Sequence, residues 1–319
     1  MKRFLTAVFL FAAAQAVFAQ SWPAKPVKVI VPFAPGGSAD TLGRLVAQKL
    51  SEHLKASFVV ENRAGAGGSL GSELASNAPA DGYTLVVSGI ASHVIAPHLP
   101  QGTPYDPVRD FTHIALFGGP PAVLAVHPSV KAKDLREFVL LAKSKPGTLS
   151  YGSPGNGTQG QLVAELFKQR AGIDIVHVPY KGASAAVTDL IAGHIPSVST
   201  TLTTAAPQIR AGKARGLAIS AASRLAEFPD LPTFAEMGYP DLVATVWFSL
   251  SGPANMPADI VERLNAEVNR ALEAQDVRER LKPEGIVPQK LTAREFSAFV
   301  AEEVKRWGPI VKASGAKND

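Results

Sequence analysis

Residues 27–50 have the sequence VKVIVPFAPGGSADTLGRLVAQKL, in which an apolar run leads through a glycine-containing turn into a second, more widely spaced apolar pattern. The run over 27–31 predicts a buried strand that ends at Pro32. Beyond the turn, leucine and valine side chains recur at helical spacing over 42–54. The stretch therefore predicts a strand followed by a helix that crosses back over a sheet.

The alternation of strand and helix patterns continues along the chain to residue 87. A helix is predicted over 69–75, between strands predicted over 57–60 and 84–87. This order is typical of a parallel sheet with crossover helices. From residue 122 the same order starts again, with strands predicted over 122–126, 149–151, 175–178 and 214–219 and a helix over 133–144.

The C-terminal part predicts one further strand over 246–250 and a last helix over 293–307. We expect this part to return to the first unit. The fold class predicted from the residues is therefore α/β, with two lobes joined by two hinge crossings, near 120–125 and 244–252. The predicted lobes comprise residues 20–121 together with 245–319, and residues 122–244.

Residues 1–19 predict a signal peptide. Lys2 and Arg3 form a basic start, residues 4–18 are apolar, and the small side chain of Ala19 is suited to cleavage nearby. The alternative is an uncleaved membrane anchor, but the apolar run is shorter than the roughly 20 residues that a membrane span needs. We therefore expect export to the periplasm.

The composition limits the chemistry of the exported chain. The 319 residues include no cysteine, which excludes disulfides, thiolate catalysis and a lipid-modified cysteine. The formal net charge of +5 falls to +3 when Lys2 and Arg3 leave with the signal peptide. Lys and Arg do not form a stripe interleaved with aromatic residues, so a nucleic-acid partner is not expected.

The loop over 32–40 lies between the first predicted strand and the first helix. Its two glycines let backbone N–H groups approach a ligand, and a helix start carries unpaired donors with a partial positive charge. Such a loop binds an anion without Lys or Arg. The alternative is a structural turn, with Ser38 as the N-cap residue and Asp40 favoured by the helix dipole. The carboxylate of Asp40 would repel an anionic ligand unless water or an ammonium group lies between them.

The loop over 153–160 contains Gly-x-Gly-x-x-Gly between a strand and a helix, and Asp174 lies about 20 residues further on. A dinucleotide-binding fold would show this spacing, so an extracytoplasmic dehydrogenase is one alternative. A soluble nicotinamide cofactor is not expected outside the cytoplasm, which counts against this alternative. The same loop also predicts a second helix start suited to a carboxylate, or simply a glycine-rich turn.

Polar residues also follow the strand over 84–87, where the loops of a parallel sheet face the ligand crevice. Ser88 and Ser92 can donate hydrogen bonds to an oxyanion, whereas His93 is expected to pack inside the protein. A hydrolase that uses Ser92 or Ser153 is a further alternative. The chain carries no nucleophile elbow, no Walker loop and no pair of histidines at metal-ligand spacing. No cofactor and no metal are therefore expected.

Several short motifs occur in order along the chain after the signal peptide. They are PFAPGGSAD at 32–40, VENRAGAGG at 60–68, DGYTL at 81–85, YDP at 105–107, GNGT at 155–158, HVPYKG at 177–182 and LNAEV at 264–268. Together they resemble the Bug family, the extracytoplasmic solute receptors of tripartite tricarboxylate transporters. The resemblance covers nearly all of the mature chain.

This resemblance implies a type II periplasmic-binding-protein fold that closes on a small carboxylate. Members of the family hold the carboxylate with backbone amides and bridging waters from the two glycine-rich loops. Carried over by position, the ligand-binding residues of the first lobe are Phe33, Gly36, Gly37, Ser38, Ala39 and Asp40. We add Pro35 of the same loop, and Ser88 and Ser92 for their place after the strand over 84–87. The ligand-binding residues carried over to the second lobe are Ser153, Asn156, Gly157 and Thr158.

The chain departs from the family pattern at two places. Many members carry Phe-Asp-Asn-Leu where this chain has Ser-Thr-Thr-Leu over 199–202, and a frequent Asn of the third loop is Ala96 here. We include Thr200 and Thr201 among the candidate ligand-binding residues. The two glycine-rich loops are expected to bind a carboxylate as in the family. The part of the site that contacts the far end of the ligand, near 199–200, is expected to differ. An amino-acid ligand is then less suited than a polar organic acid.

The resemblance also indicates the partners of the protein. A solute receptor of this kind is not an enzyme and needs no cofactor. It delivers its ligand to the membrane permease subunits of a tripartite transporter, or it signals to a membrane sensor kinase. We expect the protein to act as a monomer.

Overall fold

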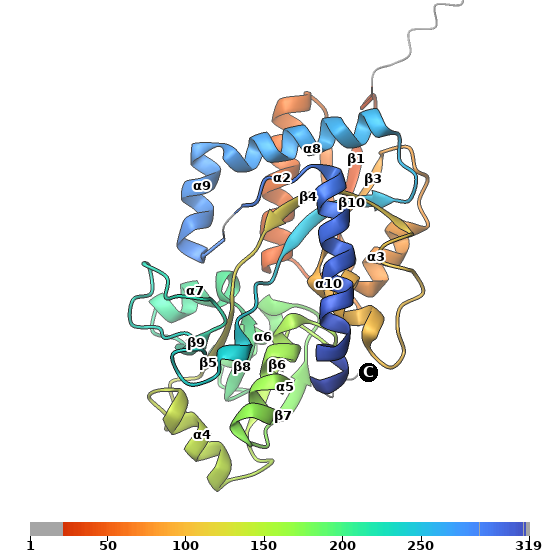
Figure 1. Ribbon diagram of the computed structural model, residues 1–319. Helices are drawn as coiled ribbons and strands as arrows, with labels where there is room; N and C mark the ends of the chain where they lie inside the picture. The colour runs from red at the N-terminus through yellow and green to blue at the C-terminus, as the bar shows by residue number, and fades with distance from the viewer. Residues whose placement is uncertain (1–21, 287, 315, 317–319) are drawn as a thin grey trace, which may run out of the picture.

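The computed structural model of the chain describes residues 22–286, 288–314 and 316. It shows two α/β lobes, one above the other in Figure 1, each built around a five-stranded sheet. The predicted signal peptide at 1–19 lies outside the described residues. In the part that is described, no helix is both long and apolar enough to cross a membrane.

The sheet of the first lobe has the strand order β2-β1-β3-β10-β4. Strand β1 pairs in parallel with β2 and β3, whereas β10 runs antiparallel to both β3 and β4. The sheet is therefore mixed, not wholly parallel as expected. Its strands are β1 (Val27–Val31), β2 (Phe58–Asn62), β3 (Thr84–Gly89), β4 (Phe111–Gly118) and β10 (Phe248–Pro253).

Helices cover both faces of this sheet. Helix α2 buries Leu42 and Leu50, the side chains whose spacing predicted it, and packs beside α8. The helices are α2 (Ser38–Leu54), α3 (Ser69–Ser76), α8 (Ala258–Glu273), α9 (Gln275–Leu281) and α10 (Ala293–Ser314). Single turns occur at η1 (Ala66–Gly68), η2 (Ala91–Ile95), η3 (Ala96–His98) and η5 (Lys282–Glu284).

The sheet of the second lobe has the order β7-β6-β8-β5-β9 and repeats the plan of the first. Strand β6 is parallel to β7 and β8, and β5 is antiparallel to β8 and β9. The strands are β5 (Ala122–Val126), β6 (Ser150–Ser153), β7 (Val176–Pro179), β8 (Ser197–Thr201) and β9 (Arg215–Ile219). The helices are α4 (Leu135–Ser144), α5 (Gln159–Ala171), α6 (Ala183–Ile191) and α7 (Leu202–Arg210), with a turn at η4 (Pro240–Leu242).

Two chain crossings between the lobes lie side by side and form a hinge. Pro121 bridges to Thr245, and the N–H of Val246 donates to the carbonyl of Pro120 at 2.9 Å. The approach is close, because a Cβ on Gly119 would lie 1.6 Å from the carbonyl oxygen of Val246. The crossings are shorter than predicted, since the apolar residues on either side continue as β5 and β10. These two strands are the antiparallel ones in their sheets.

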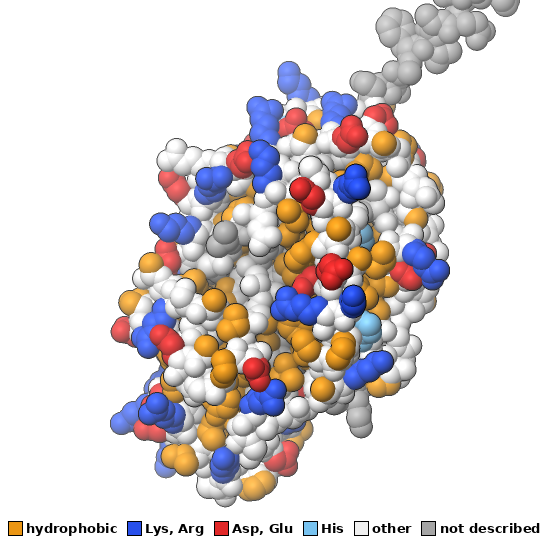
Figure 2. Space-filling view, in the orientation of Figure 1, with side chains coloured by type: hydrophobic (Ala, Val, Ile, Leu, Met, Phe, Trp, Pro, Cys, Tyr) orange, Lys and Arg blue, Asp and Glu red, His pale blue; other side chains and the backbone are white. Residues whose placement is uncertain are grey.

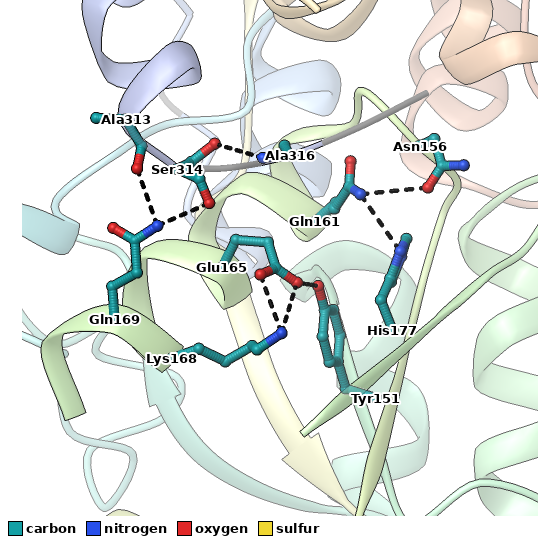
Figure 3. Close-up of polar contacts among 10 residues, drawn as sticks. All are labelled: Tyr151, Asn156, Gln161, Glu165, Lys168, Gln169, His177, Ala313, Ser314 and Ala316. Carbon is teal, nitrogen blue, oxygen red and sulfur yellow. Dashed lines mark hydrogen bonds and ion pairs between the residues drawn. The ribbon is translucent and has the colours of Figure 1, made fainter. Parts of the chain in front are cut away.

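The last helix, α10, extends beyond the predicted end at residue 307 and reaches the second lobe (Figure 1). The side-chain amide of Gln169 on α5 donates to the carbonyls of Ala313 at 2.9 Å and Ser314 at 2.8 Å (Figure 3). The helix thus belongs to the first lobe along most of its length and contacts both lobes at its end.

Candidate functional site

A cavity of about 50 Å³ lies between the lobes, at the ends of the strands that carry the glycine-rich loops. The first lobe and the hinge contribute Phe33, Gly37, Ser38, Ala39, Gly89, Ile90, Ala91, Ser92, Val246 and Phe248. The second lobe contributes Pro154, Thr158, Gln159, Gly160, Ala183 and Thr201. No Lys, Arg, Asp or Glu side chain is among these lining residues.

Four helices begin at the cavity wall. Ser38, Gln159 and Ala183 are the first residues of α2, α5 and α6, and Thr201 is the N-cap residue of α7. Helix starts carry unpaired N–H donors and a partial positive charge. Two of the four, α2 and α5, were expected from the sequence. The cavity is therefore suited to an anionic group although no cation lines it.

The start of α2 keeps its backbone donors free. Gly37 is the N-cap residue and no side chain caps the helix, so the N–H groups of Ser38 and Ala39 have no partner within the helix or its cap. The hydroxyl of Ser38 lies 2.5 Å from that of Thr201 in the second lobe. This contact joins the two lobes at the edge of the cavity.

Asp40 supports the first loop from behind and does not line the cavity. Its carboxylate is 4% exposed and accepts hydrogen bonds from the Gly36 N–H at 3.0 Å, from Arg44 at 3.0 Å and from the Asn62 amide at 2.9 Å. Burial acts to raise the pKa of Asp40, but these hydrogen bonds and the charge of Arg44 together hold the pKa below its ordinary value of 3.8. The Asp40–Arg44 pair leaves the loop without net charge.

The second loop is stabilised by Gln161. Its side-chain oxygen accepts the N–H of Gly157 at 2.8 Å, and its nitrogen lies 3.2 Å from the Asn156 side-chain oxygen and 3.3 Å from His177 Nδ1 (Figure 3). A further N–H of this loop, that of Gly155, donates to the hydroxyl of Ser153 at 3.2 Å. These two loop amides are therefore bonded inside the second lobe and do not face the cavity.

The same contacts decide the proton positions at Ser153. The nitrogen of Gln161 can only donate, so Nδ1 of His177 accepts and Nε2 carries the proton. His177 Nε2 then donates to Ser153 Oγ at 2.7 Å, and the Ser153 hydroxyl donates to the carbonyl of Gly155 at 3.1 Å. Histidine in this tautomer does not take the proton of Ser153, which is the step that a serine hydrolase requires.

The third loop is divided between the cavity and the sheet. Ser92 lines the cavity, and its hydroxyl lies 3.0 Å from His93 Nδ1. Ser88 lies instead in the sheet, where its hydroxyl is 2.7 Å from those of Ser249 and Ser251. This network reaches His113, whose Nδ1 is 3.1 Å from the Ser251 hydroxyl. The hydroxyl of Ser88 is therefore bonded within the first lobe.

Both histidines of the third-loop region are buried. The ring of His93 packs on Phe111 with centroids 4.3 Å apart, and it does not line the cavity. Burial lowers the pKa of His93 well below its ordinary value, and the neighbouring His113 lowers it further. Burial also lowers the pKa of His113, to about 4, although a hydrogen bond to the Pro107 carbonyl acts in the other direction. Both side chains are neutral near pH 7.

The structure brings about half of the sequence-predicted residues to the cavity. Those that line it are Phe33, Gly37, Ser38, Ala39, Ser92, Thr158 and Thr201. Asn156 lines a neighbouring groove of about 420 Å³, which also lies between the lobes. The residues that line neither are Pro35, Gly36, Asp40, Ser88, Ser153, Gly157 and Thr200.

Several lining residues were not predicted. Gln159 is the most polar of them; its side chain is 1% exposed, and its amide oxygen and nitrogen have no partner among the described residues. Ala183 was not predicted because no strong pattern in the sequence indicated α6. An apolar wall is supplied by Ile90 directly after β3, Val246 in the hinge and Phe248 at the start of β10. The one available signal for Gln159 was its position directly after Thr158, at the predicted helix start.

The two lobes are closed on the cavity. The N–H of Ala34 donates to the carbonyl of Lys181 at 3.3 Å, and the hydroxyl of Ser184 donates to the carbonyl of Pro35 at 2.8 Å. Gly67 approaches the second loop so closely that a Cβ there would lie 2.1 Å from the carbonyl oxygen of Asn156. These contacts surround the space in which a ligand would be enclosed.

The face of the molecule drawn in Figure 2 carries charges of both signs. Figure 2 shows Lys and Arg interspersed with Asp and Glu on the face drawn, with apolar side chains between the lobes. Within the described ranges, no group of three His, Cys, Asp or Glu side chains could hold a metal ion.

Comparison with known families gives one match over most of the chain. Residues 42–316 match the family model described as the tripartite tricarboxylate transporter family receptor, TctC. Protein BugT of Bordetella pertussis is 36% identical to this chain over 322 aligned residues, which cover 99% of each.

Solved structures of the same architecture are similar over more than nine-tenths of the chain. One described as a periplasmic transporter is 40% identical, covers 93% of this chain and 99% of its own, and superposes with a TM-score of 0.90. Rpa4515 of R. palustris, solved with adipate, is 33% identical with the same coverage and a TM-score of 0.89. MatC (Rpa3494) of Rhodopseudomonas palustris, solved with bound malate, is 33% identical, covers 91% of this chain and 100% of its own, and has a TM-score of 0.86.

Proposed function

Because this chain belongs to the tripartite tricarboxylate transporter receptor family, the Bug family, we propose that it captures a small organic acid in the periplasm by closing its two lobes around the ligand. The proteins of this family and the neighbouring structures are solute-binding proteins, and the proposed function includes no chemical step. The neighbours Rpa4515 and MatC carry adipate and malate, which are both carboxylates. A carboxylate also suits the cavity of this chain, because four helix starts surround it.

The observation that carries the proposal is the set of four helix starts around a cavity without charged side chains. Each helix start stabilises an anion by about 0.3–1 kcal/mol, and by more when it is partly buried. The free N–H groups of Ser38 and Ala39 supply direct hydrogen bonds to the carboxylate. Thr158 and Thr201 close the site from the second lobe, with waters bridging the remaining gaps.

The predicted residues outside the cavity act on the shape of the loops. Asp40 holds the N–H of Gly36, and the Gly157 N–H is held in the same way by Gln161. Pro35 accepts a hydrogen bond from Ser184 across the lobes. We therefore assign these residues to closure and loop geometry, and Ser88 and Thr200 to the packing of their sheets.

Closure requires the lobes to move as two bodies, 20–121 with 245–319 and 122–244, about the paired crossings at 120 and 246. The ligand shifts the equilibrium toward the closed form by no more than its extra affinity for that form. The closed receptor then delivers the ligand to the permease subunits of a tripartite transporter, or contacts a sensor kinase. The protein reaches the periplasm as a monomer after cleavage near Ala19.

The test is a binding screen of the mature protein after removal of any bound ligand by unfolding and refolding. Thermal unfolding is followed with a panel of carboxylic acids and with NAD, and mass spectrometry identifies small molecules released by the protein as first purified. At 100 times its Kd, a bound acid is expected to raise Tm by roughly 5 °C or more. If NAD raises Tm and no acid does, the proposal is wrong and the dehydrogenase alternative gains support.

A further inference from the structure

Gln159 is a buried polar residue that lines the cavity. It is the first residue of α5, directly after the N-cap residue Thr158, and only 1% of its surface is exposed. It lines the cavity from the second lobe, and Ser38, the first residue of α2, lines it from the first lobe, so a ligand bound there would lie between the two residues.

Both polar atoms of this amide lack a partner. Neither the oxygen nor the nitrogen of Gln159 forms a hydrogen bond with any described residue. Gln161, two residues along the same helix, shows the opposite state. Its amide oxygen accepts the N–H of Gly157, and its nitrogen bonds Asn156 and His177, as Figure 3 shows. A buried amide without partners is costly in free energy. The two unmet groups of Gln159 therefore define what a ligand must supply.

The amide restricts the chemistry of the ligand. In either orientation it presents one acceptor and one donor side by side. A carboxylate only accepts hydrogen bonds, so it satisfies the nitrogen and leaves the oxygen unmet. An ammonium group would satisfy the oxygen, but no carboxylate side chain lines the cavity to balance its charge. A ligand that places a neutral donor beside a carboxylate oxygen satisfies both atoms.

We propose that Gln159 selects short 2-hydroxy acids, the hydroxyl donating to the amide oxygen and the adjacent carboxylate oxygen accepting from the amide nitrogen. The second carboxylate oxygen then faces the free N–H groups of Ser38 and Ala39 at the start of α2. The cavity of about 50 Å³ has room for only a few water-sized groups, which favours a short chain. This inference rests on the proposed function and narrows its ligand class.

The test compares acids that differ only in the 2-hydroxyl group. Isothermal titration of the ligand-free mature protein is carried out with malate against succinate and with lactate against propionate. We expect at least one hydroxy acid to bind 10-fold or more tightly than its deoxy partner, because a site built to bond a hydroxyl rejects ligands that lack it.

The variant that isolates the amide is Gln159→Met, which keeps the length of the side chain and removes both polar atoms. It is expected to reduce the preference for the hydroxy acid to about twofold. Both acids lose the hydrogen bond between their carboxylate and the amide nitrogen, but only the hydroxy acid also loses the bond from its hydroxyl to the amide oxygen. Gln48→Met, on the exposed face of α2, is the matched control and should keep the full preference. Circular dichroism verifies that each variant is folded.

The outcomes separate this inference from the proposed function. If no acid binds the folded wild-type protein, both fail. If acids bind without a preference for the hydroxyl, or if Gln159→Met keeps the preference, the inference is overturned and the receptor function stands. Collapse of the preference in Gln159→Met alone supports the assignment.

Discussion

The two loops that face each other across the cavity share a geometry and differ in what they leave free. In each, a glycine two residues before the helix donates its N–H to a side chain four residues later, Gly36 to Asp40 and Gly157 to Gln161. The start of α2 has no side-chain cap, whereas Thr158 caps α5 by accepting the N–H of Gln161. The first loop thus leaves backbone N–H donors at the start of α2 unbonded. In the second loop the start of α5 is capped by Thr158, and the side chain of Gln159 lies next to it.

This difference teaches that a glycine-rich helix start predicts a conformation but not a free donor. The residue at the third helical position decides whether the preceding amide is used inside the loop. At this position the first loop has Asp40, whose negative charge is paired with Arg44 and which also accepts a hydrogen bond from Asn62. The second loop has the neutral Gln161. If the contrast is right, changes in the first loop should weaken ligand binding, whereas changes in the second should mainly lower stability.

The largest effect is expected from Ser38→Pro, which removes a single backbone donor of the first loop. Proline is tolerated at the first helical position, and Gly37 before it is already extended, so α2 should remain intact. Loss of a hydrogen bond to a charged group should weaken binding of the preferred acid about 100-fold, or about 2.7 kcal/mol, by titration calorimetry. Ser38→Ala keeps the N–H and is the control. Equal losses in both variants would mean that the hydroxyl, not the backbone, holds the ligand.

The next largest effect is expected on the free energy of unfolding at low pH, because the first lobe contains two buried histidines, His93 and His113. The pKa of His113 is lowered to about 4 from 6.5, so the unfolded chain takes up a proton before the folded one does. The stabilising contribution is complete above pH 6.5 and is lost as pH falls toward 4. At pH 5 the loss is roughly 2 kcal/mol relative to pH 7, measured by urea unfolding.

His113→Gln is the matching variant for this pH dependence. It should unfold with a smaller decrease in stability between pH 7 and pH 5, while His93 continues to act in the same direction. An unchanged profile in His113→Gln would show that this side chain gains its proton without cost in the folded state.

A smaller effect is expected from Gln161→Leu in the second loop. The N–H of Gly157 loses its acceptor, and burial of an unpaired donor should lower the free energy of unfolding by about 1–2 kcal/mol. Gln161→Glu keeps the acceptor and should retain part of this stability. Chemical denaturation measures both. If ligand affinity falls as far as in Ser38→Pro, the second loop binds the carboxylate directly and the contrast between the loops is wrong.

The smallest effect is expected from Asp40→Asn. The amide oxygen can still accept the Gly36 N–H, but the ion pair with Arg44 is lost, so stability at pH 7 should fall by about 1 kcal/mol. Because the pKa of Asp40 is below 3.8, its contribution is present above that pH and is lost as pH falls further. The difference between wild type and variant should therefore shrink below about pH 4. Denaturant unfolding of both proteins at pH 7 and in acid provides the measurement; a constant difference would show that the charge of Asp40 contributes nothing.

The parts of the fold that the sequence predicted well are those with apolar periodicity. Strands β1 and β5 have the predicted bounds, and α2 buries the leucines that predicted it. Strand β8 was not predicted as an element because its sequence, SVSTT, is polar although all five residues are buried. The antiparallel direction of β10 was not predicted either, since it depends on where the chain returns through the hinge.

The site was predictable to the extent that it follows from local conformation. The helix starts at Ser38 and Thr158 follow from strand, turn and helix patterns, and both residues line the cavity. Whether a polar group is free depends on contacts far away in the sequence, such as those of Ser88 with Ser249. For the same reason the open amide of Gln159 could not be distinguished from the fully bonded amide of Gln161.

The end of α10 has a practical consequence for anyone who handles this protein. Gln169 of the second lobe bonds the carbonyls of Ala313 and Ser314 at the end of α10, a helix of the first lobe. Under the proposed closure, a bulky group attached at this end of α10 would strain a junction that opens and closes with the lobes. The same position is attractive for a biosensor, because a fluorophore attached there would report the movement optically.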